Sequence, residues 1–315
     1  MKDISIIGAT SQLGVHLVNR LSASGYRVNA TYRSPDRIPE TWNDNDLINC
    51  VRLDLNGQPD LGALCTDHVV WLAHLDQGRF NEREVETNLE PFERFLKCSA
   101  DSSVRQITLI SSGGSVYGEA QHLPITEDHP RDPLSSYGKA KKAMEDALIP
   151  FGKSTQVRIA IVRPGNIYGF ESPAKGSKGI VGAFLNSSLT RTPFTLIHEG
   201  MTVRDFIHVD DICQAVVCAI ESEKKEKIWN AGTGVASRIS DVLDLIIQRS
   251  GLEKPEFVHQ PNYSSDVQSN VLSIERIINE SHWKPAISLE DGIDATVTNW
   301  MNSFSTNVAF RTTDC

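Results

Sequence analysis

A tyrosine and a lysine one helical turn apart could carry out proton chemistry in this chain. Tyr137 and Lys141 stand at i and i+4, so on a helix both side chains would project from one face. A free phenol, with a pKa of about 10, is a poor base at neutral pH. A nearby ammonium would stabilise the phenolate and lower that pKa. Because this spacing is common by chance, the surrounding elements must decide its interpretation.

A glycine-containing loop near residue 10 could hold a dinucleotide. It follows the apolar run 4–7 and precedes a segment whose apolar side chains fall on one helical face: Leu13, Leu17, Val18 and Leu21. Glycines let a backbone turn sharply against a pyrophosphate, and a helix N-terminus offers N–H groups and a positive dipole end. The residues predicted to contact the cofactor here are Gly8, Thr10, Ser11, Gln12, Leu13 and Gly14.

The end of the second predicted strand indicates which dinucleotide is bound. An acidic residue there would bond the ribose 2′-hydroxyl of NAD, but this chain has Arg33. A guanidinium pairs with a 2′-phosphate, which favours NADP, although Arg33 could equally stack on the adenine or face solvent, leaving NAD open. Asp54 follows the predicted strand 51–53, where it could accept from the adenine amino group or cap the next turn.

The order of apolar and amphipathic segments predicts an α/β fold with a doubly wound parallel sheet. Strands are expected at 4–7, 26–32, 69–73, 106–111 and 157–162, with helices at 81–100 and 137–149. We predict a Rossmann domain over 1–165 with a contribution from 205–235, a smaller substrate domain from 166–204 and 236–301, and a flexible tail at 302–315. In the smaller domain, Ser240 is expected to cap a helix ending before Gly251, and Ser288 with Asp291 a second helix.

Composition excludes several classes of partner. The net charge is −9, and the most basic stretch, 224–227, contains and is preceded by glutamates, so nucleic-acid binding is not expected. No apolar run is long enough to span a membrane, and no leader peptide is predicted. The six cysteines show no C-x-x-C pair and no metal-site spacing, which predicts a reducing, cytoplasmic location and no metal.

Several longer motifs occur in one characteristic order. They are residues 8–14, Ser111–Gly118, Tyr137–Lys141, Arg163–Gly169, Arg204–Asp211, Trp229–Gly234 and His282–Pro285. Together they resemble the NAD-dependent epimerase/dehydratase family, the extended short-chain dehydrogenases typified by UDP-glucose 4-epimerase. The resemblance covers roughly residues 3 to 300.

The resemblance implies roles for individual residues. Tyr137 would transfer the proton at a sugar hydroxyl, and Lys141 would hold the nicotinamide ribose. Further cofactor contacts would come from Asp54, Leu55, Leu72, Ala73, Asn88 and Ser111. A nucleotide-sugar substrate would meet Asn166 and, at its diphosphate, Arg204, whose alternative is a salt bridge to Asp205 or Asp210.

Three positions depart from the family pattern. Ser11 stands where glycine is usual, which is acceptable if its φ is negative. The usual catalytic Ser/Thr aligns with Gly113, so Ser112, Ser115 or a water would supply the hydroxyl. Tyr263 replaces a second phosphate-binding arginine, which would weaken diphosphate binding or indicate another substrate.

The family leads us to expect a nucleotide-sugar 4-epimerase that regenerates its cofactor. The main alternative is an NADPH-dependent reductase of nucleotide-linked 4-keto sugars, which Arg33 would suit. A 4,6-dehydratase is disfavoured because residues 113–115 lack an acidic pair, and a non-catalytic dinucleotide-binding protein because Tyr137 and Lys141 are both present. The family further suggests polysaccharide synthesis and a homodimer. Its interface would use Leu89, Phe92, Phe95, Leu96, Met144 and Leu148, unless these form the core.

Overall fold

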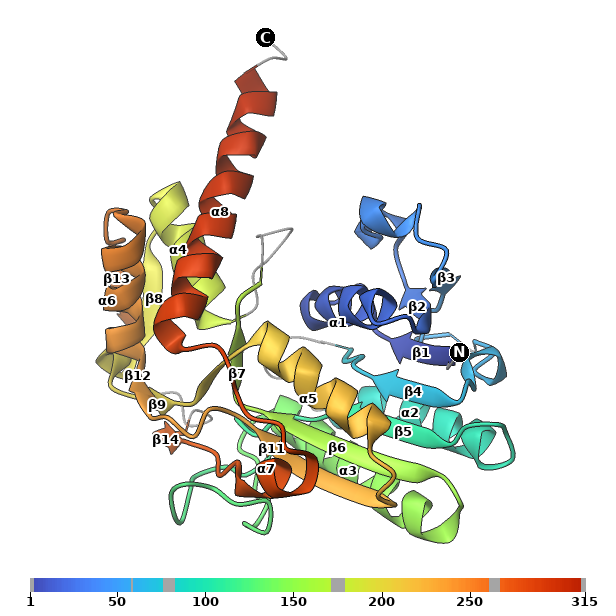
Figure 1. Cartoon of the computed structure of the whole chain (residues 1–315). Helices are drawn as coiled ribbons and strands as arrows, with labels where there is room; N and C mark the ends of the chain where they lie inside the picture. Colours follow the sequence, from blue (N-terminus) through green and yellow to red (C-terminus); the bar gives the residue numbers. More distant parts are fainter. Residues whose placement is uncertain (1–2, 58, 76–82, 171–178, 261–266, 313–315) are drawn as a thin grey trace.

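The computed structural model describes residues 3–57, 59–75, 83–170, 179–260 and 267–312, the last eight of them by backbone only (Figure 1). Within these residues, seven strands form one parallel sheet in the order β11-β6-β5-β4-β1-β2-β3. Its strands are β1 (Asp3–Ile7), β2 (Arg27–Tyr32), β3 (Ile48–Arg52), β4 (His68–Trp71), β5 (Gln106–Ile110), β6 (Arg158–Pro164) and β11 (Glu226–Ala231). The order reverses at β1 and β4, where ligands bind in such sheets.

Helices cover both faces of this sheet, as the sequence predicted (Figure 1). Helices α1 (Gln12–Ala23) and α5 (Val209–Glu221) pack on one face, and α2 (Glu84–Ala100) and α3 (Ser136–Ser154) pack on the other. Helix α3 is longer than expected and continues through Pro150. It begins where it does because the Ser135 hydroxyl accepts a hydrogen bond from Gly138 N at 3.0 Å.

The apolar stripe predicted for a dimer interface belongs to the core of one chain instead. Phe92, Phe95, Met144 and Leu148 are fully buried and pack in one cluster beneath the sheet. Leu96 is 5% exposed in the same cluster, and only Leu89 is half-buried. The interface prediction was therefore wrong for these side chains, because α2 and α3 turn them toward β4, β5 and β6 rather than outward.

The second half of the chain forms smaller units beside the carboxyl ends of the strands. Its strands are β7 (Asn166–Tyr168) with β10 (Phe206–His208), β9 (Val203–Arg204) between β12 (Ser237–Arg238) and β14 (Ser269–Asn270), and β8 (Phe194–Ile197) with β13 (Phe257–Gln260). Its helices are α4 (Ile180–Thr190), α6 (Ile239–Ser250), α7 (Glu275–Ser281) and α8 (Leu289–Thr312). The exact domain boundaries stay a prediction.

Two of the predicted helix ends hold and one does not. Ser288 Oγ accepts from Asp291 N at 3.1 Å at the start of α8, and Gly251 ends α6 in the left-handed region with φ +66°. Ser240 is wrong as a cap, because the cap is Arg238, two residues earlier, and Ser240 lies inside α6. Helix α8 runs on to Thr312, into the segment predicted as a flexible tail.

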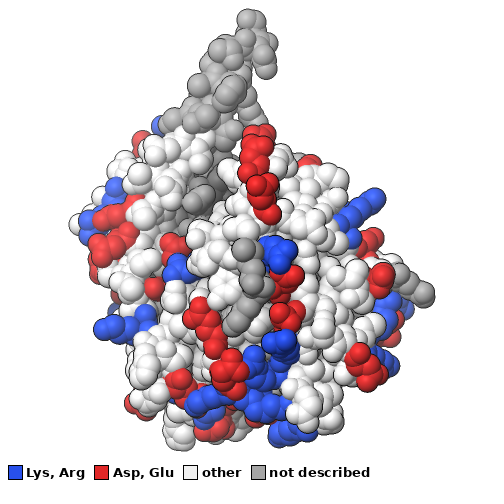
Figure 2. All heavy atoms as spheres, turned by 45° about the vertical axis from the view of Figure 1, so that its right-hand side comes forward, with Lys and Arg blue, Asp and Glu red and all other residues white. Residues whose placement is uncertain are grey.

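Figure 2 shows Lys and Arg interspersed with Asp and Glu over the described residues of one face. No helix among the described residues has both the length and the apolar character that crossing a bilayer requires.

Candidate active site

The loop between β1 and α1 is packed too closely for larger residues. Gly8 has φ +91°, and a Cβ there would lie 2.8 Å from Ala73 N. A Cβ on Gly14 would lie 2.4 Å from Ala9 O. Ser11 fits because its φ is −73°, and its hydroxyl caps α1 by accepting from Gly14 N at 3.1 Å. The expected backbone turn and exposed helix N-terminus are thus both present.

A groove of about 470 Å³, here called the nucleotide groove, runs from this loop across the ends of β2, β3 and β4. Its lining contains Gly8, Thr10, Ser11, Gln12, Leu13, Arg33, Leu55, Leu72 and Ala73, all predicted from sequence. The tight glycine loop, the helix N-terminus and the apolar walls suit a dinucleotide. Arg37, at the end of the 3₁₀ turn Pro35–Arg37, joins Arg33 in this lining and was not predicted.

Two predicted cofactor residues lie outside the groove lining and bond the backbone nearby. Asp54 is exposed and its Oδ1 accepts from Asn56 N at 3.1 Å, so it caps the turn while Leu55 lines the groove. Asn88 does not line the groove. Its amide holds the chain after β4, because Oδ1 accepts from Leu75 N at 2.7 Å and Nδ2 donates to Leu75 O at 3.1 Å and Glu84 O at 2.8 Å.

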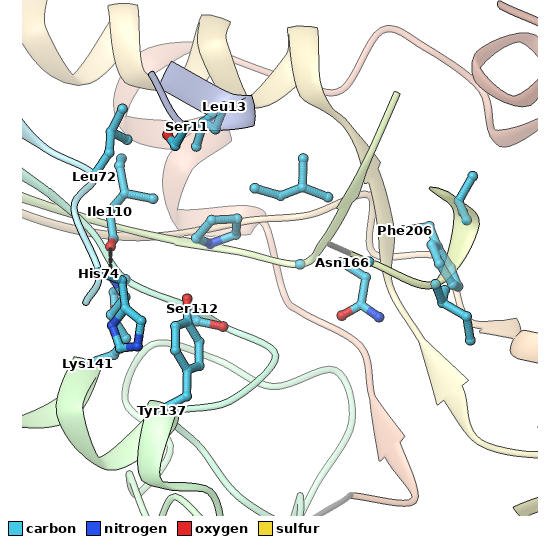
Figure 3. Close-up of a pocket in the computed structure, with 17 residues that line it drawn as sticks. Ser11, Leu13, Leu72, His74, Ile110, Ser112, Tyr137, Lys141, Asn166 and Phe206 are labelled. Carbon is cyan, nitrogen blue, oxygen red and sulfur yellow. Dashed lines mark hydrogen bonds between the residues drawn. The ribbon is translucent and has the colours of Figure 1, made fainter. Parts of the chain in front are cut away.

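A second cavity of about 360 Å³, here called the tyrosine cavity, opens beside the groove. The two share part of their lining: Ser11, Leu13, Leu72, His74, Tyr137, Ile167 and Gly179. In Figure 3, Tyr137, Ser112, Lys141 and His74 lie on one side of the tyrosine cavity, with Asn166 across it. Tyr137 therefore stands where a cofactor in the groove and a substrate in the cavity would meet.

Burial controls the protonation of the central pair. It raises the pKa of Tyr137 to about 12, against a hydrogen bond with Ser112 that lowers it and a charge on Glu84 that raises it further. The lowered value expected from the sequence is thus not produced by the side chains alone. Burial lowers the pKa of Lys141 to about 8, and the Glu145 carboxylate opposes this. Lys141 Nζ donates to Ile110 O at 3.0 Å and lies 5.7 Å from the Tyr137 ring centre.

Of the two serines that could replace the usual Ser/Thr, only Ser112 lies in the lining of the tyrosine cavity. Ser112 lines the tyrosine cavity and lowers the pKa of Tyr137, whereas Ser115 is outside the lining. A Cβ at Gly113 would lie 2.7 Å from a Leu272 methyl and 3.0 Å from Arg163 O, so a larger residue at this position would crowd both. Ser112 is therefore the candidate partner of Tyr137.

The predicted substrate residues are only partly brought together. Asn166 lines the tyrosine cavity, with its backbone N bonded to Asp205 O at 2.7 Å. Arg204 is 5% exposed, lies outside the lining, and donates to Val203 O at 2.8 Å. Asp205 instead accepts from residues 233, 234 and 272. Tyr263 lies outside the described residues.

Two buried carboxylates beside the pair were missed. Glu145, one turn after Lys141 on α3, accepts from Arg163 Nη2 at 2.6 Å, Arg131 Nη1 at 2.9 Å and the Ser111 hydroxyl. Ser111 lines the cavity but is almost fully buried, and this bond to Glu145 satisfies its hydroxyl. The i+4 spacing from Lys141 could have indicated Glu145.

The second carboxylate belongs to Glu84, at the start of α2. Its Oε1 lies 2.8 Å from His74 Nε2, and its Oε2 accepts from the Ser136 hydroxyl. Nothing in the spacing of these three residues could have joined them, because they come from the loop after β4 and the beginnings of two helices.

Comparisons with known proteins agree with this geometry. Residues 4–232 match the NAD dependent epimerase/dehydratase family. A Methanocaldococcus jannaschii protein named "Putative UDP-glucose 4-epimerase" is 32% identical over 95% of this chain and 98% of its own length. The UDP-glucose 4-epimerase of Thermotoga maritima, solved with UDP-glucose, superimposes with a TM-score of 0.86 at 25% identity over 96% of this chain and 99% of that one. The Thermus thermophilus UDP-glucose 4-epimerase, solved with NAD, gives 0.82 at 25% identity over 94% and 98%.

The chain therefore belongs to the NAD-dependent epimerase/dehydratase family, among the extended short-chain dehydrogenases. Its fold is the Rossmann-like fold of that family.

Proposed function

We propose that this protein is a nucleotide-sugar 4-epimerase acting at C4 of a nucleotide-linked hexose. The observation that carries the proposal is the position of Tyr137, which lines both the nucleotide groove and the tyrosine cavity. A single side chain can thus reach a sugar hydroxyl in the cavity beside a dinucleotide in the groove. The 4-epimerases among its relatives support the same reaction.

The residues divide the proton work. A bound nicotinamide would accept a hydride from the sugar and return it. Tyr137 takes the C4 hydroxyl proton during oxidation and gives it back during reduction. Ser112 donates a hydrogen bond to the phenolate, and Lys141 brings positive charge to the same side of the cavity. Because the buried phenol alone has a pKa of about 12, added positive charge near the ring is what makes it a base.

The sugar would lie between Tyr137 and Asn166, on opposite sides of the tyrosine cavity (Figure 3). We assign Asn166 to a sugar or phosphate oxygen, and Arg204 and Tyr263 to the diphosphate end. UDP is the nucleotide we favour, since the relatives named above are UDP-glucose 4-epimerases.

The choice between NAD and NADP depends on Arg33 and Arg37, which both line the nucleotide groove at the end of β2. Two guanidiniums there favour a 2′-phosphate. This is also the observation that supports the second candidate function, an NADPH-dependent 4-keto-sugar reductase. Replacing both arginines by alanine should weaken NADPH binding roughly tenfold and leave NADH binding nearly unchanged. Equal losses for both cofactors in a fluorescence titration would remove the NADP preference.

The function is tested by incubating the purified protein with UDP-glucose, UDP-N-acetylglucosamine and a dTDP-4-keto-6-deoxyhexose, with and without NADPH. Chromatography follows the sugar, and absorbance follows the NADPH. A 4-epimer formed without loss of NADPH supports the epimerase. NADPH consumed only with the keto sugar, and no epimer, identifies the reductase instead.

We further propose a cytoplasmic homodimer. Since the predicted stripe is internal, the outward faces of α2 and α3 remain for the contact, with half-buried Leu89 on α2 and Leu134, which is 40% exposed, in the loop just before α3. Sedimentation at several concentrations should show a dimer, and a concentration-independent monomer mass would overturn this.

A further inference from the structure

A polar cluster of His74, Glu84 and Ser136 lies against the tyrosine at the heart of the proposed mechanism. The three residues come from the loop after β4, the first residue of α2 and the first residue of α3. Glu84 is only 4% exposed although its side chain is a carboxylate. Its two oxygens meet different partners: His74 Nε2 at 2.8 Å and the Ser136 hydroxyl. A buried carboxylate held on both oxygens is a fixed charge rather than a solvated one.

The cluster is placed rigidly next to Tyr137. The His74 and Tyr137 rings meet edge to face, with centroids 4.6 Å apart and planes at 74°. Ser136 directly precedes Tyr137 on α3. Asn88 links the backbone next to His74 to the backbone of Glu84, because its Nδ2 donates to both Leu75 O and Glu84 O. A shift of Glu84 would therefore move the ring that lies against the phenol.

The charges around the phenol oppose one another. The Glu84 carboxylate raises the pKa of Tyr137, and the Ser112 hydroxyl lowers it. Lys141 Nζ lies 5.7 Å from the ring centre and itself faces Glu145. A carboxylate can only accept hydrogen bonds, so His74 Nε2–H donates to Glu84 and spreads its negative charge. Without this contact, Glu84 would act on Tyr137 with only Ser136 to offset it.

We propose that His74 is a positioning residue for Tyr137, in which the imidazole, fixed by Glu84 and Ser136, orients the phenol and offsets the carboxylate that opposes formation of the phenolate. The inference rests on the proposed function, because it concerns the same tyrosine. His74 lines both the nucleotide groove and the tyrosine cavity. Its task would be to orient Tyr137 and adjust its pKa, not to contact the reacting atoms.

The proposal predicts opposite effects of two neighbouring substitutions. His74→Leu leaves the Glu84 charge less compensated, so the pKa of Tyr137 should rise and the acidic limb of the kcat/KM profile should move up by about one pH unit. Glu84→Gln keeps the shape and removes the charge, so the same limb should move down. The double variant should lie between them, and Ser136→Ala should shift the limb in the direction of His74→Leu by a smaller amount.

The same shifts can be read without turnover. The tyrosinate absorbance is titrated in the NAD-saturated protein without sugar. Each variant is compared with the same variant that also carries Tyr137→Phe, and the difference between the two titrations reports Tyr137 alone. Glu86→Gln, an exposed residue on the same helix, is the matched control and should leave the titration unchanged. These outcomes count only in variants whose thermal unfolding is unchanged. The proposal would be overturned if the pKa of Tyr137 shifted in the same direction in His74→Leu and Glu84→Gln. It would also be overturned if that pKa did not shift in either of these variants or in Ser136→Ala. This titration stands apart from the substrate assay, in which failure to form any 4-epimer would instead count against the proposed function.

Discussion

Two buried carboxylates flank the Tyr137–Lys141 pair, and their charges are compensated differently. Glu145, behind the lysine, has no exposed surface and receives hydrogen bonds from two guanidinium groups and a serine hydroxyl. Glu84, beside the tyrosine, accepts hydrogen bonds from one imidazole and one hydroxyl. The first carboxylate raises the pKa of Lys141, and the second raises that of Tyr137.

The difference separates an anchor from an adjustable contact. Guanidiniums stay charged at every relevant pH, so Glu145 is paired with permanent charges and holds α3 against β6 through Arg163. The two groups that bond Glu84, an imidazole and a hydroxyl, carry no permanent charge. We infer that the anchor fixes where the base stands, while the contact of Glu84 sets how readily it ionises.

The largest effect should come from the residue between the two clusters. Tyr137→Phe removes the proton acceptor and keeps the ring, so kcat should fall by about 10²–10⁴-fold. Cofactor affinity, measured by fluorescence titration, should remain close to that of the unaltered chain. Turnover preserved in this variant would remove Tyr137 from the mechanism and make the comparison of its neighbours irrelevant.

The anchor is tested by adjacent substitutions on α3. Glu145→Gln leaves the buried Arg163 without its carboxylate and removes one of the two carboxylates of the partly exposed Arg131, so we expect the free energy of unfolding to fall by about 3 kcal/mol or more. Asp146→Asn is the control, because this carboxylate is 43% exposed and binds the same Arg131 as well as Lys142. Its loss should stay below about 1 kcal/mol in urea unfolding. Equal losses would mean that Glu145 is no anchor.

A substitution in the loop between β1 and α1 should affect cofactor binding without changing either carboxylate. Gly8→Ala places a Cβ 2.8 Å from Ala73 N at φ +91°, so the dinucleotide affinity should fall about tenfold or more. Gly25→Ala has a similar φ of +83° and open space around it. This control should lower stability slightly and leave the affinity intact, as measured by calorimetry with NAD.

The smallest effect concerns pH at the lysine. Burial lowers the pKa of Lys141 to about 8, so the ammonium loses its proton above that pH and kcat/KM should decline there. Lys141→Arg keeps the charge and should move this descending limb upward. Glu145→Gln, which removes a charge that raises the pKa of Lys141, should move it to lower pH. A limb unaffected by either change would separate Lys141 from the alkaline decline.

The sequence predicted the part of the molecule in which local pattern and position coincide. The loop at Gly8, the doubly wound parallel sheet and the pair on α3 follow from glycine placement and helical period; the structure has that sheet, and most of the predicted cofactor residues line the groove. Contacts between distant segments could not be read in this way. The joining of His74 to Glu84, and the inward direction of Phe92, depend on how α2 rotates against the sheet. Asn88 was assigned to the cofactor from resemblance alone; its amide bonds the backbone of Leu75, and its contact with a cofactor stays a prediction.

The most direct test of the central claim is an isotope measurement on UDP-glucose carrying deuterium at C4. The account predicts that UDP-galactose forms with the deuterium still at C4 and with no net change in the cofactor, because the hydride taken from C4 returns to the same carbon. Loss of the deuterium from the product, or oxidation of added NADPH with no epimer formed, would contradict it.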